Sequence, residues 1–152
     1  MQSVYPAPSS EFGFRPTKAQ FYLLSLTWGL FETAVGACLA AGLIITGHKP
    51  EKWGLCCAFE VGEDWGGFSM GPFFVTQRGA SAYLKNHEHG HALQNCIFGP
   101  LMPFIINGPS TCRYWYRRTV KSKKMRKPYD SVWFEADATK RGTEYVKNLE
   151  NV

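Results

Sequence analysis

Three of the four histidines in this 152-residue chain lie within five consecutive positions, in the stretch NHEHGH. His87, Glu88 and His91 match the pattern HExxH. On an α-helix, residues four apart are separated by about 40° around the axis and about 6 Å along it, so both imidazoles can reach one metal ion. Zinc suits this pair of ligands, and Glu88 is placed to deprotonate a water bound at an open coordination position. The stretch therefore predicts a zinc site with Glu88 as the general base.

A histidine-rich helix without a dedicated site is the simpler alternative. Clustered histidines can bind a metal adventitiously or cap a surface, and Lys85 places a charge just before the motif. However, HExxH rarely arises by chance in a chain with four histidines, so we favour the metal site.

A catalytic zinc ion needs a third protein ligand, and the stretch YDSVWFEADATKRG offers carboxylates for it. We expect Glu135 to be this ligand. Asp137 is the competitor, but side chains two helix positions apart point about 200° apart, so only one of them can face the site. His89 lies on another face of its helix, where we expect it to support the site or to be exposed. We expect His48 at a membrane interface rather than at the metal.

A long apolar segment precedes these residues. Phe21 to Thr46, within residues 20–47, contains 26 residues and a single charge, Glu32. At about 1.5 Å per residue it can cross a hydrocarbon core of about 30 Å, which predicts a transmembrane helix. A signal peptide is the rival, but the stretch is too long for one. Glu32 would face protein or water, either as a contact to an embedded site or without a role. The proline-containing residues 1–19 are expected to form a flexible arm.

The segment between this helix and the histidines is expected to be β-structure. Residues 53–76 contain two apolar runs around a glycine-rich interruption from Gly62 to Gly67, which is typical of a β-hairpin. A broken second membrane helix is the alternative, because periodicity cannot separate the two in runs this short.

Signals for helix ends place the histidines in the middle of a helix. Ser81 is the predicted N-cap, and the helix should end near Gly99 and Pro100. Residues 97–109 are apolar but too short to span a bilayer, so we expect a re-entrant or interfacial segment there. A last helix over residues 131–148 carries Glu135.

The predicted fold is a mainly α membrane protein with a minor β part, in one domain over residues 1–152. Residues 53–148 form its metallopeptidase-like unit. If the segment after the HExxH helix crossed the bilayer, the histidines and Glu135 would lie on opposite sides and could not share an ion. The zinc site therefore requires a re-entrant segment.

Positive charge is concentrated in one block. The net charge is +5, and Arg113 to Lys127 contains eight Lys and Arg residues and no acid. Tyr114, Trp115 and Tyr116 accompany the arginines, as at a membrane–water boundary on the cytoplasmic side. We expect the block to bind anionic lipid, and the chain to lie in the cell membrane with the metal site on or near the cytoplasmic side. Nucleic acid is not an expected partner, because no nucleic-acid motif accompanies the block.

The order of these elements resembles the gluzincin branch of zinc peptidases, especially the membrane-linked family containing the prenyl-protein and heat-shock proteases. The blocks GGFSMGPFFV, NHEHGHALQNCIFGPLMPF and WFEADATKRG are also similar to small uncharacterised bacterial membrane proteins. The resemblance covers residues 53–144 and implies that His87, His91 and Glu135 bind the metal and that Glu88 is the base. One position departs from the family pattern: gluzincins often have an Asp four residues after the ligand glutamate, and here Thr139 stands there.

The expected function is that of a membrane-embedded or membrane-apposed zinc metallopeptidase acting on a peptide or a membrane-protein substrate. Tyr129 and Tyr145 are possible oxyanion donors. The alternative is a non-catalytic metal-binding membrane protein whose basic segment binds lipid or a partner. The five cysteines include no CxxC pair, which argues against a cysteine zinc site and favours a reducing environment.

Overall fold

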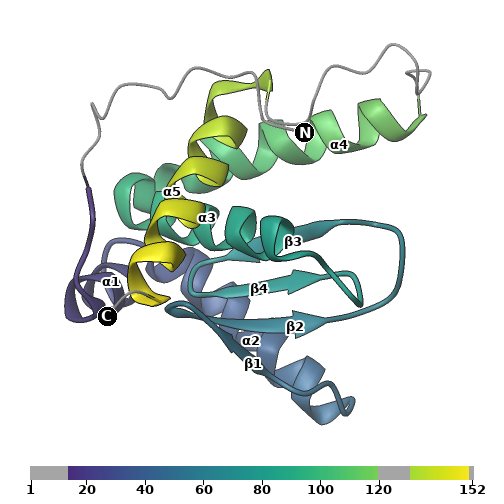
Figure 1. Cartoon of the computed structure of the whole chain (residues 1–152), viewed down its shortest axis with the longest axis horizontal. Helices are drawn as coiled ribbons and strands as arrows, with labels where there is room; N and C mark the ends of the chain where they lie inside the picture. Colours follow the sequence, from purple (N-terminus) through teal and green to yellow (C-terminus); the bar gives the residue numbers. More distant parts are fainter. Residues whose placement is uncertain (1–13, 120–130, 151–152) are drawn as a thin grey trace.

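The computed structural model describes residues 14–119 and 131–150, which form a small mixed sheet surrounded by helices (Figure 1). Most of the predicted arm and the second half of the basic block lie outside the described residues. The elements, in chain order, are α1 (Lys18–Leu26), α2 (Leu30–Ile45), β1 (Glu51–Trp53), β2 (Cys56–Glu60), β3 (Gly67–Met70), β4 (Phe73–Thr76), α3 (Ala82–Phe98), the short helical turns η1 (Gly99–Leu101) and η2 (Pro103–Asn107), α4 (Gly108–Thr119) and α5 (Trp133–Glu150).

The prediction of one transmembrane helix over residues 20–47 is wrong. The segment forms two helices, α1 and α2, which meet at an angle of 93°. The chain turns at Gly29, where a Cβ would overlap the side chain of Asn95 on α3, and the indole of Trp28 donates a hydrogen bond to the carbonyl oxygen of Ile97 (3.1 Å). Among the described residues no single helix is long and apolar enough to cross a membrane, although the bent pair together has the required length and composition.

The sheet has the strand order β1-β2-β4-β3. β1 pairs with β2 and β3 pairs with β4 in antiparallel hairpins, whereas β2 and β4 are parallel. The predicted hairpin around Gly62 to Gly67 is therefore wrong, because β2 and β3 are not neighbours. The residues between them carry the chain past β4, so that β3 becomes an edge strand.

Helices cover both faces of this sheet. Ala58 of β2 packs in one apolar cluster with Leu93 of α3, and its neighbour Phe59 packs in another with Ala40 of α2. Successive strand residues point to opposite faces, which is why β2 serves both clusters. α5 packs on the outer side of α3 (Figure 1).

The HExxH helix, α3, begins after Ser81, whose hydroxyl accepts a hydrogen bond from the Leu84 amide, as the sequence predicts. It ends at Gly99, which has a positive φ of 50°. The apolar segment that follows is not a loop: η1 and η2 lead directly into α4. Met102 and Ile106 of this segment pack against Phe134 of α5 in a third apolar cluster. The segment therefore reverses the chain beside the site instead of carrying it away.

Candidate metal centre

Helices α3 and α5 cross with their backbones in contact, and glycine permits this at two positions. A Cβ on Gly90 would overlap the carbonyl oxygen of Ala138, and a Cβ on Gly142 would overlap the carbonyl oxygen of Asn86. Any side chain at either position would force the helices apart. This close crossing lets Glu135, in the first turn of α5, reach the histidines of α3.

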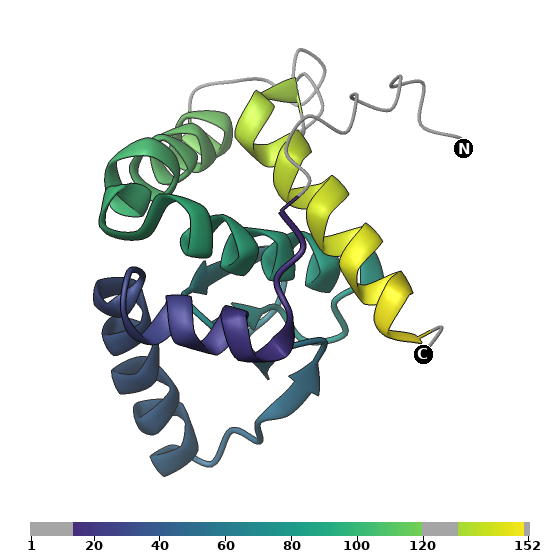
Figure 2. The ribbon, with the colours of Figure 1, turned by 90° about the vertical axis from the view of Figure 1, so that its left-hand side faces the viewer.

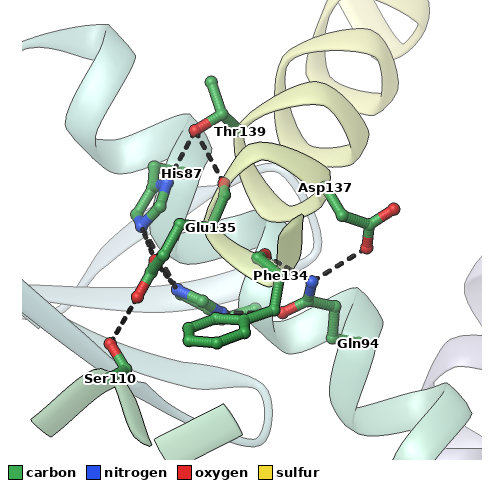
Figure 3. A network of polar contacts seen from close by, with 8 residues as sticks. His87, Gln94, Ser110, Phe134, Glu135, Asp137 and Thr139 are labelled. Atoms are coloured by element: carbon green, nitrogen blue, oxygen red, sulfur yellow. Dashed lines mark hydrogen bonds and ion pairs between the residues drawn. The ribbon is translucent and has the colours of Figure 1, made fainter. Parts of the chain in front are cut away.

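Ligand-type atoms of His87, His91 and Glu135, one from each, lie close together. Figure 3 shows His87 and Glu135 facing each other from α3 and α5. Oε2 of Glu135 lies 3.1 Å from Nε2 of His87 and 3.2 Å from Nε2 of His91. The two Nε2 atoms are 3.2 Å apart. All three side chains are buried. The group could hold a metal ion.

Thr139 determines how His87 presents its ring. Its hydroxyl donates to the carbonyl oxygen of Glu135 one turn earlier (3.1 Å) and lies 2.8 Å from Nδ1 of His87. Because its hydrogen is already used, the hydroxyl accepts from His87, and the imidazole hydrogen is on Nδ1. The lone pair of Nε2 then faces the centre, as a metal ligand requires. Thr139 thus fills the place where the family resemblance expects an Asp.

Gln94 orients the ring of His91 as Thr139 orients that of His87. The side-chain nitrogen of Gln94 donates to the backbone oxygen of Phe134 and to Oδ2 of Asp137, both at 2.8 Å. Its oxygen, 2.8 Å from Nδ1 of His91, therefore accepts the imidazole hydrogen. Asp137, the alternative ligand considered from sequence, does not face the centre; it holds Gln94 and pairs with Arg141 (2.7 Å).

The second oxygen of Glu135 is also bound. Ser110, in the first turn of α4, donates its hydroxyl to Oε1 at 2.5 Å. Burial opposes ionisation of Glu135, but the hydrogen bond from Ser110 and the two imidazoles, whenever these carry a hydrogen on Nε2, hold the pKa of this carboxyl well below its usual range. With both imidazole hydrogens on Nδ1, the centre instead has three electron-rich atoms facing one another. A carboxylate and two imidazole lone pairs directed at one point repel one another unless a cation lies between them. The electrostatics of the centre therefore favour a bound cation.

Glu88 lies beside this centre and is only 3% exposed. Burial raises the pKa of Glu88, and the charge of Glu135 adds to the rise against the opposing effect of His87 and His91. Its Oε2 has no hydrogen-bond partner among the described residues. The carboxyl group abuts β3, because a Cβ on Gly67 would lie 2.8 Å from Oε1. Glu88 thus lies close to the three candidate ligands, and its Oε2 accepts no hydrogen bond from α4 or α5.

Two pockets meet at His87 and Glu88. The larger, of about 650 Å³, lies between β3 and the η2–α4 segment and also contains His91 and Ser110. The smaller, of about 360 Å³, continues from Glu88 past residues 64–67 towards Arg117 and Arg118. The candidate centre therefore lies at the bottom of a cleft that is open to a small molecule or a peptide.

The other candidate residues lie elsewhere. His89 is fully buried instead of exposed; its Nε2 accepts from the Leu55 amide (3.1 Å), and burial lowers its pKa to about 4. Tyr145 stacks on His89 and donates its hydroxyl to a backbone carbonyl, so it does not line the cleft. His48 follows α2 and bonds to Thr46, away from the candidate ligands. Tyr129 lies outside the described residues.

Sequence reasoning missed Gln94, Ser110 and Tyr114. Gln94 is three residues after His91 and therefore on the same helix face, which is a usable signal. Ser110 and Tyr114 reach the site only because η1 and η2 fold α4 back over it. The sequence predicts a re-entrant segment over residues 97–109, but no pattern in it indicates that this segment places α4 over the site.

Comparisons of the chain with protein-family models, with curated proteins and with solved structures find no match. The gluzincin resemblance therefore stays a prediction, and function is inferred from the site itself.

Proposed function

We propose that this chain is a zinc-dependent peptide hydrolase in which His87, His91 and Glu135 bind zinc and Glu88 is the general base. The observation that carries the proposal is the position of Glu88. The buried Glu88 lines the same cleft as His87 and His91, and its pKa is raised towards the range in which a carboxylate can both accept and return a proton.

The donor set supports zinc as the metal. Two imidazole nitrogens and one carboxylate oxygen are typical of catalytic zinc sites, which keep a fourth position open. Ligands bound tetrahedrally at 2.0–2.1 Å lie about 3.3 Å from one another. The separations between the three ligand atoms, 3.1 to 3.2 Å, are close to that value.

Zinc, when bound, would polarise the scissile carbonyl and acidify a water in its open position. Glu88 would take the proton of that water and pass it to the leaving amine. Thr139 and Gln94 keep the hydrogens of His87 and His91 on Nδ1, away from the centre. Ser110 leaves only Oε2 of Glu135 available to the metal.

The cleft suits an extended peptide. β3 pairs only with β4 among the described strands, so its other edge presents backbone groups towards the larger pocket. An extended chain can add to such an edge through main-chain hydrogen bonds. Trp65, Phe68 and Met70 line this wall and would contact apolar side chains of the substrate.

Tyr114 supplies a candidate donor for the developing oxyanion. It lines both pockets, and its hydroxyl lies 2.6 Å from Arg118, which donates to it and leaves the phenolic hydrogen free for a substrate oxygen. Loss of one such donor typically lowers turnover about 10²- to 10³-fold. Tyr114→Phe should therefore reduce kcat on a cleaved peptide while zinc content is unchanged.

The decisive comparison is between Glu88→Gln and the wild-type chain. The amide is nearly isosteric but cannot accept a proton, so the variant should keep its zinc and lose cleavage of a mixed peptide library. Glu144→Gln, at an exposed position on α5, is the matched control and should cleave normally. Equal cleavage by Glu88→Gln would contradict the proposal. If the His87→Ala variant unfolds while the Glu88→Gln variant behaves as the wild type does, the metal is structural instead of catalytic.

A further inference from the structure

Helix α2 has its polar side chains on the buried side and apolar residues on the exposed side, which is the reverse of a helix in contact with water. One half of its circumference is buried against the sheet and the η1 turn, and this half contains its polar side chains, Glu32 and Thr33. Glu32 is 2% exposed and accepts a hydrogen bond from Asn107 (2.9 Å). The outer half consists only of apolar residues and glycine: Leu30, Phe31, Ala34, Val35, Ala37, Cys38, Ala41, Gly42, Ile44 and Ile45. Helices in contact with water normally show polar side chains on that side.

The apolar surface extends beyond α2. Leu23 and Leu26 of α1 and Trp28 at the bend are exposed, and so are Leu101 of η1, which packs beside α2, and Phe104 of the following η2. Figure 2 shows α2 on the side of the molecule opposite the C-terminal end of α5. We call the outer half of α2 together with these five residues the apolar face. Exposed apolar patches of this kind mark contact surfaces.

We propose that the apolar face docks the protein on an anionic lipid bilayer, with α1 and α2 lying in the interface instead of crossing it. Charge favours lipid over a protein partner. Every charged side chain exposed between Phe14 and Pro50 is basic: Lys18 begins α1, Lys49 follows α2, and Arg15 pairs with Glu144 of α5 (3.5 Å). Apolar side chains bordered by basic ones are the pattern of helices that lie in the plane of an anionic membrane surface. Trp28 at the bend is exposed, and tryptophan is enriched at membrane–water interfaces.

Docking in this way would place the cleft next to the bilayer. The backbone of Met70, which lines the larger pocket, lies against Gly36 of α2, and Asn107, which lines the same pocket, bonds to Glu32. This part of the inference depends on the proposed hydrolase function: the substrate would be a polypeptide segment at the membrane surface. The docking itself does not depend on Glu88 or on the metal.

Co-sedimentation with vesicles tests the docking. The protein should bind vesicles of phosphatidylcholine mixed with phosphatidylglycerol more strongly than phosphatidylcholine alone. Phe31→Asp and Ile45→Asp should each weaken binding about tenfold or more, since each removes a large apolar side chain from lipid. Leu149→Asp, at an exposed apolar position near the end of α5, is the matched control for Ile45→Asp and should bind as the wild type does. Glu88→Gln should also bind normally, so that the docking and the hydrolase proposal fail separately.

The two exposed cysteines provide a second measurement. Cys38 lies on the apolar face and Cys112 on α4. A polarity-sensitive dye attached to Cys38 in a Cys112→Ser chain should shift to the blue on vesicles, and a dye on Cys112 in a Cys38→Ser chain should shift much less. Vesicle binding that persists in Phe31→Asp and Ile45→Asp would overturn the proposal. A dimer in solution that these substitutions dissociate, without vesicle binding by the wild type, would assign the face to a second copy of the chain.

Discussion

The backbone of α5 at Ala138 lies against the backbone of α3 at Gly90, so closely that a Cβ at position 90 would overlap the Ala138 carbonyl oxygen. Gly90→Ala must separate the two helices, and with them Glu135 from the histidines. Overpacking of this kind typically lowers stability by about 1–3 kcal/mol. We expect a lower melting temperature and a loss of metal affinity, measured by thermal unfolding and by metal titration.

Gly42→Ala is the control for that change. Gly42 is also a helical glycine, but a Cβ there meets nothing within 4 Å. The alanine should raise stability by up to about 1 kcal/mol, because glycine is the poorer helix former. Equal effects of the two substitutions would show that the helix contact at Gly90 does not matter.

The hydrogen bond between Thr139 and His87 leads to a second prediction. Thr139→Val has nearly the same shape but cannot accept the Nδ1 hydrogen, so His87 loses the partner that orients it. Removing such partners typically weakens metal binding about 10- to 100-fold. Thr139→Ser keeps the hydroxyl and should bind nearly as the wild type does. Competition with a chromogenic chelator measures both, and a Thr139→Val chain with wild-type affinity would contradict the assigned role.

Sequence reasoning reached the spacing of the candidate ligands but not the contacts that arrange them. HExxH and the helix carrying Glu135 can be predicted because both depend on local periodicity. The bend at Gly29 cannot, because it depends on Asn95, which is distant in sequence. The hydropathy of residues 20–47 shows how apolar the segment is. It gives no information that Glu32 and Thr33 are buried against the rest of the protein.

Lys85, an unexpected charge before the HExxH motif, is 6% exposed and joins α3 to the sheet. Its Nζ lies 2.7 Å from Glu51 and 3.0 Å from Glu60. Lys85→Met should lower the free energy of unfolding at neutral pH by about 1–3 kcal/mol, since hydrogen bonds to charged groups contribute in that range. Denaturant unfolding of the two chains measures this difference.

The ion pair between Lys85 and Glu60 predicts that the stabilising effect of Lys85 depends on pH. The hydrogen bond from Lys85 lowers the pKa of Glu60 from its usual 4.5. A carboxyl group whose pKa is lower in the folded chain stabilises it fully above the unfolded value, and the effect is lost as the pH falls through the folded value. The stability difference between the wild type and Lys85→Met should therefore shrink below about pH 4.5. A difference that grows in acid would contradict the pairing.

Metal content of the purified chain tests the central claim most directly. Elemental analysis of the wild type and of Glu135→Ala, each purified without added chelator, should find about one zinc per wild-type chain and much less in the variant. His91 and His87 alone would leave too few ligands to retain the ion. A wild-type chain that contains no metal, or a variant that retains as much zinc as the wild type, would contradict the proposed site.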